Sequence, residues 1–306
     1  MMVSKYARRS VLKGVGAAAV TLTAARTGFT QDRTGQAIKV EAKGRNFVRY
    51  KFGDLTLIAL RDGYVDMPPT RLRQGGGQAY DHPPSAVPLV DGMLRLSVNA
   101  YLIIEQDLHF LIDTGASNSW EPSMGRLLDA LAAADVSRDK ITNIALTHTH
   151  TDHVNGLVAP DGSGAFPKAE RIFVGLEEAP IFDTSNRLAR FRERLVPIDN
   201  NFPISDRITA VRAAGHSIAH TAFEVEAGEE RLLVWGDIIH VPSAQFSRPE
   251  LTWELDGDQG NAMETRLRIL DRVSKPNFYV AGAHLDFPGV GRVQKRGNSF
   301  HFGPLE

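Results

Sequence analysis

Short apolar runs separated by turn residues recur along the chain from residue 55 onward. Such runs, rich in branched and aromatic side chains, are typical of β-strands. They predict strands at Leu55–Leu60, Val98–Ile104, Leu108–Ile112, Ile144–Thr147, Ile172–Val174, Ile208–Arg212, Ala222–Glu226, Leu232–Trp235 and Phe278–Ala281. The stretch from Arg71 to Pro88 is rich in glycine and proline, which predicts a long surface loop.

Two segments between these strands have apolar residues at helical spacing. One carries Leu127, Leu128, Leu131 and Ala134 on one face. The other is predicted to begin at Asn261, because a glutamate three residues later completes a capping-box pattern. Strands with interspersed helices predict a layered α/β (α+β) domain. We find no internal repeat and no linker that would divide residues 47–306, and we expect residues 26–46 to form a loose, flexible arm.

The first 25 residues differ from the rest. Lys5, Arg8, Arg9 and Lys13 precede a run of small apolar residues at 15–25, and no acidic residue occurs before Asp32. This layout is typical of a secretory signal peptide, and the arginine pair resembles the twin-arginine export signal. An N-terminal amphipathic helix is the alternative. We expect a signal peptide at 1–25, the twin-arginine export machinery as a partner, and a periplasmic or secreted protein without a stable membrane anchor.

Composition narrows the chemistry. The 306 residues carry a formal net charge of −1, which argues against binding nucleic acid by counterion release. The chain has ten histidines and no cysteine. Disulfides, thiolate metal sites, iron–sulfur clusters and a cysteine nucleophile are therefore excluded. Any bound metal must be held by histidine, aspartate, glutamate or water.

The metal-ligating residue types are concentrated directly after the strand that ends near Thr147. The sequence His148-Thr149-His150-Thr151-Asp152-His153 places three imidazoles and a carboxylate within six residues. Alternate residues of an extended chain share a side, so His148, His150 and Asp152 are expected on one side and His153 on another. Such a set suits a borderline divalent cation. A chance occurrence of this pattern is on the order of one in a thousand, so coincidental histidines in a polar loop are a remote alternative.

Three more strands end in a residue of the same kind. His216 follows Gly215, Asp237 follows Gly236, and His284 follows Gly282-Ala283, in each case after an apolar strand. Alone, each would be interpreted as a hydrogen-bonded loop residue. Four such strand ends in one chain indicate a shared functional site.

These motifs, in this order, resemble those of the metallo-β-lactamase superfamily. The matching residues are Asp113-Thr114-Gly115, the run 148–153, Gly215-His216, Gly236-Asp237 and Ala283-His284. The resemblance covers residues 47–305 and implies a four-layer αββα sandwich. Further stretches resemble the methyl parathion hydrolase-like branch of binuclear metallohydrolases: Asp113–Ala116, Ala165–Pro167, Gln245-Phe246 and Ala283–Gly291.

The resemblance implies a binuclear site. One metal would be held by His148, His150 and His216, the second by Asp152, His153 and His284, with Asp237 bridging both. Asp113 would orient a ligand histidine, and His220 and His240 are expected as supporting or satisfied core histidines. The metals are expected to be zinc, with manganese, cobalt or iron as alternatives. Where the family usually has Pro-Gly-His-Thr-Pro-Gly-His, this chain has Ala214-Gly215-His216-Ser217-Ile218-Ala219-His220 and lacks both prolines.

The implied activity is hydrolysis of an ester-like bond, such as a phosphotriester, aryl ester or lactone, by a metal-bound hydroxide. Asp152 or Asp237 would move the proton. The resemblance places Trp120, Phe182 and Phe191 in an aromatic substrate pocket, although ordinary core packing is the alternative for each. The bridging aspartate argues against β-lactam hydrolysis, and we do not expect the glutathione-binding helical region of thioester-cleaving members.

Two interpretations from other classes remain open at this point. A flavo-diiron-type redox enzyme would need a flavin domain, for which the chain has no room. A non-catalytic metal-binding module would not need all seven ligand residues. The sequence leaves the physiological substrate and a homodimer open.

Overall fold

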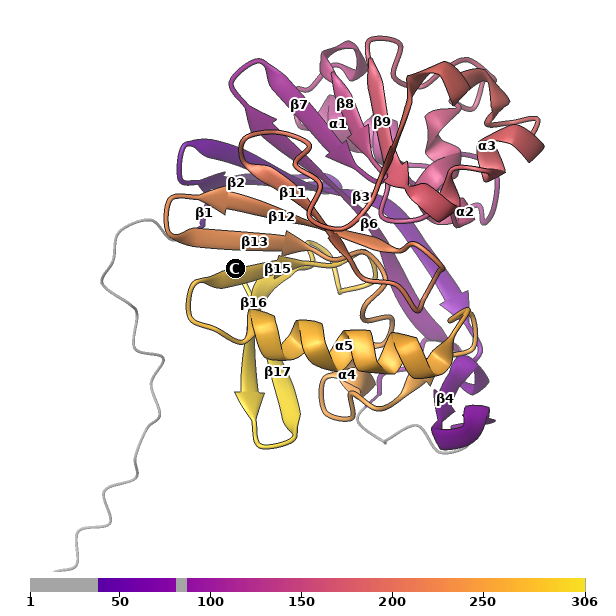
Figure 1. The fold of residues 1–306 in the computed structure, drawn as a ribbon, viewed down its shortest axis with the longest axis vertical. Coiled ribbons are helices and arrows are strands. Elements are labelled where there is room, and N and C mark those ends of the chain that lie inside the picture. The colour runs from indigo at the N-terminus through magenta and orange to yellow at the C-terminus, as the bar shows by residue number, and fades with distance from the viewer. Residues whose placement is uncertain (1–37, 81–86, 306) are drawn as a thin grey trace, which may run out of the picture. The chain divides into compact units, whose positions relative to one another are not determined.

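The computed structural model describes residues 38–80 and 87–305. Most strands form two large sheets (Figure 1). The larger sheet has the order β1-β2-β3-β6-β7-β8-β9-β10. Its strands are β1 Lys39–Gly44, β2 Phe47–Phe52, β3 Leu55–Met67, β6 Leu94–Glu105, β7 Leu108–Ile112, β8 Asn143–Ala145, β9 Arg171–Gly175 and β10 Leu195–Ile198.

The second sheet has the order β11-β12-β13-β15-β16-β17. Its strands are β11 Ile208–Arg212, β12 Thr221–Ala227, β13 Glu230–Val234, β15 Phe278–Ala281, β16 Val290–Arg296 and β17 Ser299–Pro304. A small third sheet pairs β14 Thr252–Trp253 with β4 Leu72–Gln74, which pairs in turn with β5 Gln78–Ala79.

Helices are short apart from one. They are α1 Leu127–Ala133, α2 Thr151–Val154, α3 Ile181–Thr184, α4 Pro242–Gln245 and the long α5 Gln259–Val273. Short 3-10 helices lie at Pro69–Arg71, Gly75–Gly77, Arg138–Lys140, Asn155–Leu157, Leu176–Glu178 and Ala189–Arg194.

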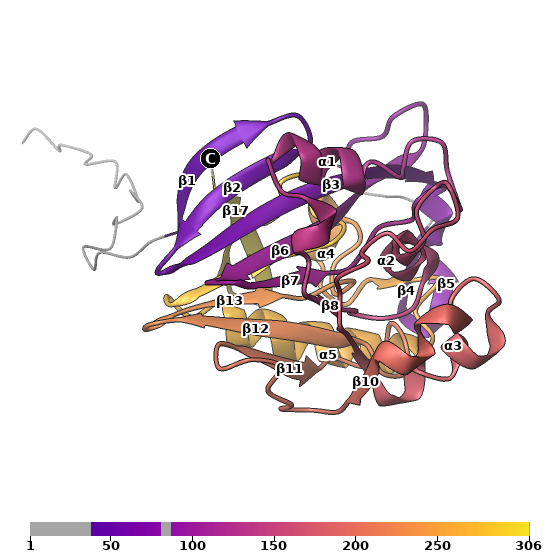
Figure 2. The same cartoon turned by 90° about the horizontal axis from the view of Figure 1, so that it is seen from above.

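Side chains alternate between the two faces of each sheet, and both faces are buried. Leu57 of β3 packs with Phe223 and Leu232 of the second sheet, so these residues fill the space between the sheets. Their neighbours point the other way: Ile58 packs with the leucines of α1, and Leu233 packs with Ile269 and Leu270 of α5. The layers are therefore helices, sheet, sheet and helix, which confirms the expected αββα sandwich (Figure 2).

The sequence located most strands of the sandwich but misplaced some boundaries. Residues 39–44, expected within a loose arm, form β1 paired with β2, because the alternating run at 47–52 offers a strand edge to bind. Part of the predicted loop at 71–88 forms β4 and β5. Helix α5 begins at Gln259 and its N-cap is Asp258, whose side chain accepts a hydrogen bond from Asn261 N. The predicted capping box at Asn261 is therefore wrong.

Strand direction brings several chain segments to one edge. β7, β8 and β9 run parallel, and so do β13 and β15. Parallel strands present their carboxyl ends at the same edge of a sheet, where ligands commonly bind. The histidine-rich run after β8, Asp237 after β13 and His284 after β15 all leave their strands at such ends.

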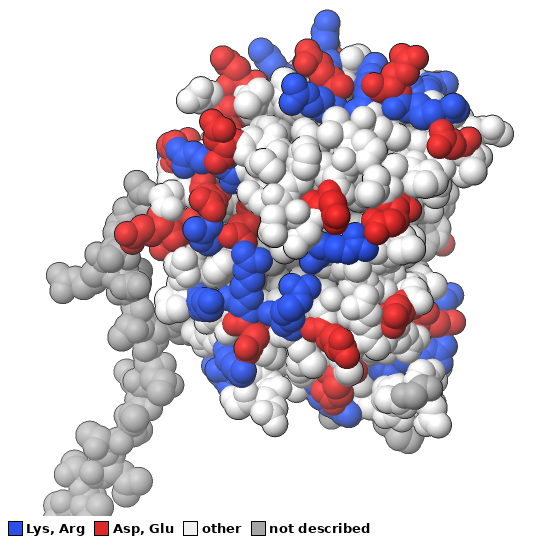
Figure 3. Space-filling model, in the orientation of Figure 1, with Lys and Arg blue, Asp and Glu red and all other residues white. Residues whose placement is uncertain are grey.

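The surface carries both charge signs. Lysine and arginine side chains are interspersed with acidic ones around an uncharged area on the face that Figure 3 shows. Within the described ranges, no helix is long and apolar enough to cross a membrane. The predicted signal peptide lies outside the described residues.

Candidate metal centre

The histidine-rich run bends sharply after His150. Strand β8 ends at Ala145, and His150 adopts extended dihedral angles as the N-cap of α2. The chain is already helical at Thr151, so Asp152 and His153 lie in the first turn of α2. The expectation that Asp152 continues the extended alternation is therefore wrong. The helical turn places Asp152 and His153 in a group with His284, although the His153 ring stays 4.1 Å from the His148 ring, centroid to centroid.

Two glycines let the other segments approach the run. Gly215 has a φ of +135°, and a Cβ there would lie 2.3 Å from Ala262 N in α5. Gly236 has a φ of +57°, and a Cβ there would lie 2.6 Å from His220 Nε2. Only glycine fits both positions without displacing a neighbour. The close approach of the backbone at these two glycines positions the next residues, His216 and Asp237, at the histidine-rich run.

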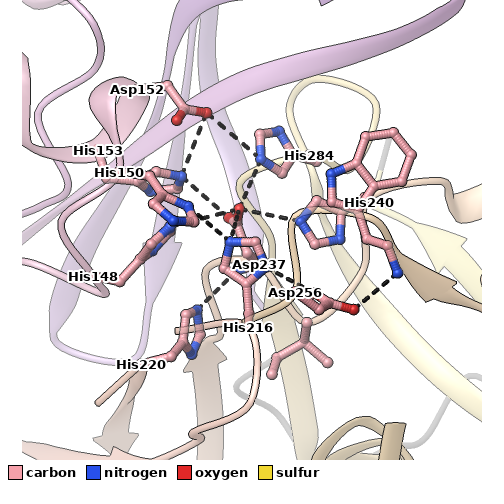
Figure 4. Close-up of polar contacts among 12 residues, drawn as sticks. His148, His150, Asp152, His153, His216, His220, Asp237, His240, Asp256 and His284 are labelled. Carbon is pink, nitrogen blue, oxygen red and sulfur yellow. Dashed lines mark hydrogen bonds and ion pairs between the residues drawn. The ribbon is translucent and has the colours of Figure 1, made fainter. Parts of the chain in front are cut away.

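The structure brings the seven sequence-predicted ligand residues together as two groups. One group is His148, His150, His216 and Asp237, and the other is Asp152, His153 and His284; within each group the ligand atoms lie within 4.8 Å of one another. All are buried except His150, which is exposed. Figure 4 shows the rings converging on the carboxylate of Asp237.

Asp237 lies at the middle of both groups. Its Oδ2 is 3.1 Å from His284 Nε2 and 3.2 Å from His216 Nε2, and its Oδ1 is 3.2 Å from His153 Nε2. His148 Nε2 is 3.8 Å from Oδ2. Asp152 Oδ2 lies 3.5 Å and 3.6 Å from the Nε2 atoms of His153 and His284.

Several inward-facing atoms are buried without hydrogen bonds. His148 Nε2, His153 Nε2 and Asp237 Oδ1 make none in the described part of the chain. Buried polar atoms are rarely left unpaired, because each costs roughly 1–3 kcal/mol. Imidazole and carboxylate donors that converge in this way suit a divalent cation of borderline softness. The residues present therefore fit the metals that the resemblance implies.

The outward ring nitrogens are held by other groups. His153 Nδ1 is 2.8 Å from Asp113 Oδ2, and His284 Nδ1 is 2.7 Å from the carbonyl oxygen of Ser97. His216 Nδ1 is 2.8 Å from Asp256 Oδ1. An acceptor at Nδ1 fixes the proton there and leaves the Nε2 lone pair free to bind a metal.

Asp113 and His220 lie where the sequence predicted supporting residues. Asp113 Oδ1 accepts a hydrogen bond from Thr147 N at 2.8 Å, which ties the end of β7 to the start of the histidine run. His220 Nε2 accepts a hydrogen bond from Asp237 N at 3.0 Å. Burial lowers the pKa of His220 to about 3, so its ring is neutral and its Nε2 can accept.

Sequence reasoning left two roles open for His240, supporting residue or satisfied core histidine, and it missed Asp256. His240 lines the cavity beside Asp237, and its ring stacks at 12° on Trp253 and at 23° on His284. Its Nε2 lies 3.3 Å from Asp237 Oδ2, and its Nδ1 makes no hydrogen bond to a described residue, so His240 borders the metal-ligand cluster. Asp256 lies 40 positions from its partner His216, in a segment without a motif, so no local signal pointed to it.

Burial and charge together set the protonation of the metal-free cluster. Burial lowers the pKa of His148 well below its usual value, and the charge of His153 adds to this. Burial would also lower the pKa of His153, but Asp237, Asp152 and Asp113 outweigh it and raise that pKa well above normal. Burial would raise the pKa of Asp152, but His153 and His284 lower it to about 2. The metal-free centre therefore holds protonated His153 against ionised carboxylates.

A cavity of about 340 Å³ opens beside the cluster. Its polar lining includes Asp152, His216, Asp237, His240 and His284. Its apolar lining, the apolar wall, consists of Val65, Met67, Leu96, Trp120, Trp253 and Leu255. Among the described residues, no lysine or arginine lines it.

The predicted aromatic pocket is only partly correct. Trp120 lines the cavity and is 39% exposed. Phe182 and Phe191 do not line it; they are buried in the core that packs against the larger sheet. Their neighbours there include Leu188 and Phe166. Core packing, the alternative reading of these two phenylalanines, is the correct one.

Comparison with known proteins gives the following matches. The family model described as "Metallo-beta-lactamase superfamily" matches residues 93–284. A solved structure described as hydrolase AbOPH in the beta lactamase superfamily is 25% identical, with a TM-score of 0.75 over 87% of this chain and 99% of that one. AidC, a dizinc quorum-quenching lactonase, is 23% identical, with a TM-score of 0.74 over 85% and 98%. A probable metal-dependent hydrolase from Staphylococcus aureus is 18% identical, with a TM-score of 0.69 over 84% and 99%. A search of curated proteins found no match.

Proposed function

The chain belongs to the metallo-beta-lactamase superfamily and is a metal-dependent hydrolase, and from this premise we propose its substrate class. We propose that it cleaves an ester-like bond in an uncharged small molecule that carries an apolar group. A lactone is the first candidate, followed by an aryl ester and a phosphotriester. The observation that supports this proposal is the lining of the cavity, which combines the histidine and aspartate cluster with apolar side chains and, among the described residues, includes no lysine or arginine.

We further propose how the residues share two divalent metals. His148, His150 and His216 would hold one metal, Asp152, His153 and His284 the other, and Asp237 would bridge them. Zinc is the first candidate, because imidazole and carboxylate ligands suit it, with manganese, cobalt or iron as alternatives. Bound in this way, the metals would polarise the scissile bond and lower the pKa of a water molecule.

The remaining steps fall to side chains around the cavity. Asp152 lines it as an ionised carboxylate at neutral pH, because its pKa is about 2, and can accept the proton released on attack. Burial lowers the pKa of His240 to about 4, so its ring is neutral and keeps one N–H to donate to an oxygen of the substrate. The apolar wall around Trp120 and Leu255 would take up the apolar group of the substrate and exclude water.

We rank the candidate substrates by the charge of the cavity lining and by the activities of structurally similar proteins. A substrate with a carboxylate beside the scissile bond, as in a β-lactam, finds no lysine or arginine partner among the described residues that line this cavity. AidC, which shares the fold, is a lactonase, and we therefore choose lactones for the first test. The resemblance to the methyl parathion hydrolase-like branch favours phosphotriesters, and this finer assignment stays a prediction.

A substrate panel tests the proposal. Purified zinc-loaded protein is assayed with an N-acyl homoserine lactone, an aryl acetate, a dimethyl aryl phosphotriester, a cephalosporin and a thioester. We expect the highest kcat/KM for one of the three neutral ester-like substrates. A cephalosporin or a charged thioester that is cleaved at least tenfold better than all three would refute the substrate class.

We also propose export by the twin-arginine route, on the basis of Arg8 and Arg9 in the first 25 residues. A fusion of residues 1–35 to a fluorescent protein that folds before export should reach the periplasm of a Gram-negative bacterium. Replacing both arginines by lysine should retain it in the cytoplasm, and export of the double variant would contradict the proposal.

A further inference from the structure

A buried arginine, aspartate and histidine form a continuous chain beside the metal centre. Asp256 Oδ1 lies 2.8 Å from His216 Nδ1, and Asp256 Oδ2 lies 3.6 Å from a guanidinium nitrogen of Arg266. Asp256 Oδ2 also accepts a hydrogen bond from Trp253 N at 2.9 Å. Figure 4 shows Asp256 on the side of the His216 ring away from Asp237. Each oxygen of Asp256 therefore has a fixed partner.

Arg266, on α5, is only 1% exposed. It donates to the carbonyl oxygen of Ile238 at 2.7 Å and to those of Leu251 and Pro249 at 2.6 Å and 3.2 Å. Ile238 directly follows Asp237, and Leu251 precedes the cavity residue Trp253. A buried guanidinium is tolerated only when its donors are satisfied. Arg266 thus joins the segment after Asp237 to the segment that forms the cavity wall.

The same segment also holds the backbone of the His216 loop. Gly257 N donates to the carbonyl oxygen of His216 and Asp258 N to that of Gly215, both at 2.9 Å. This loop has no proline between Ala214 and His220. Contacts from residues 256–258 to the ring and the backbone therefore supply a restraint that the loop's own sequence does not.

We propose that Asp256 is a positioning residue for His216, and that Arg266 holds Asp256 in this role and couples it to the cavity wall. An ionised carboxylate at Nδ1 keeps the proton on that nitrogen and aims the Nε2 lone pair at the centre. Because Asp256 also accepts a hydrogen bond from Trp253 N, it supports both the metal ligand His216 and the apolar wall of the cavity. The inference rests on the proposed metal site.

Asp256→Asn is the informative substitution, because it keeps the shape and removes the charge. An asparagine has one acceptor and one donor group where Asp256 has two acceptors. Whichever way the amide faces, its NH₂ meets the donor at Trp253 N or the donor at His216 Nδ1. The proton position on His216 is then no longer fixed.

Zinc affinity measures the effect directly. The full chain is loaded with two zinc ions and titrated with a chromophoric chelator, alongside Asp256→Asn and a matched control, Glu224→Gln. Glu224 on β12 is also buried, and it binds Arg231 and Arg272 but contacts no histidine of the cluster. We expect one of the two zinc ions to bind about 10–100-fold more weakly in Asp256→Asn, with parental affinity in the control.

A folded Asp256→Asn variant that keeps both zinc ions at parental affinity would overturn the inference while leaving the proposed function intact. Parental protein that binds no zinc would instead refute the proposed function. If Asp256→Asn does not fold, NMR of the zinc-loaded parent with ¹⁵N-labelled histidine decides. We expect a slowly exchanging, downfield Nδ1 proton on His216; a zinc-bound Nδ1 or a rapidly exchanging proton would overturn the inference.

Discussion

Replacing Asp113 by asparagine tests whether His153 is oriented for metal binding by its carboxylate partner. Asp113 accepts from Thr147 N at 2.8 Å and Thr147 Oγ1 at 2.9 Å, and its Oδ2 lies 2.8 Å from His153 Nδ1. Asparagine can keep the bond to Thr147 N with its oxygen. Its NH₂ then faces His153 Nδ1, which favours the tautomer with the proton on Nε2. That tautomer has no lone pair for a metal at Nε2.

Two magnitudes follow from these contacts. In the metal-free protein, the lost bond joins a protonated imidazole to a carboxylate, so the free energy of unfolding should fall by about 1.5–3 kcal/mol. In the metal-loaded protein, loss of such an orienting partner typically weakens metal binding by about 10–100-fold. At 1.36 kcal/mol per decade, this corresponds to about 1.4–2.7 kcal/mol for the metal held by His153.

The assay is competition with a chelator, combined with urea unfolding of the metal-free protein. Asp62→Asn is the control, because Asp62 is also buried but accepts only from the backbone N–H groups of Ala116, Gly125 and Leu127. The control should lose stability and keep both metals. A folded Asp113→Asn variant with parental affinity for both metals would refute the reasoning about the tautomer.

Three further predictions concern pH, specificity and packing. His153 and His284 hold protons in the metal-free protein because their pKa values are raised, so zinc must displace them. Their charges stabilise that fold fully below about pH 6.5, and this contribution is lost as the pH rises through the raised folded-state pKa values. Zinc affinity should rise over the same window, with proton release in calorimetry, and a pH-independent affinity would contradict this. Trp120→Ala should lower kcat/KM about tenfold for substrates with a long apolar chain and little for their short analogues, and an equal loss for both would count against the apolar wall. Phe182→Ala should cost about 3–5 kcal/mol in urea unfolding while KM stays unchanged, and a raised KM would return Phe182 to the pocket.

The sequence was most informative where local chemistry and periodicity agree. β7, β11 and β15 have the bounds that their apolar runs predict, because each run has buried side chains on both faces of its sheet and ends at a polar or glycine residue. The ligand candidates could be found for the same reason, since each follows a strand and carries a metal-binding group. The resemblance to the family then indicated which ligand residues from distant segments share a metal.

The remaining elements depend on contacts that one-dimensional patterns do not contain. β1 is mostly exposed and polar, and its strand conformation comes from pairing with β2. Asp256 acts on a residue 40 positions away through a loop, and no periodicity marks such a contact. Phe182 and Phe191 show the reverse error, because an aromatic residue near a site in sequence can pack into the core instead.

The central claim is that two metals held by this histidine and aspartate cluster are required for hydrolysis. The most direct test is elemental analysis of the purified protein, followed by prolonged chelation, reconstitution and assay, with His148→Ala in parallel. We expect two divalent metal ions per chain, complete loss of hydrolysis on chelation, recovery at two equivalents of zinc, and no turnover by His148→Ala. Undiminished turnover by the metal-stripped parent would contradict the account.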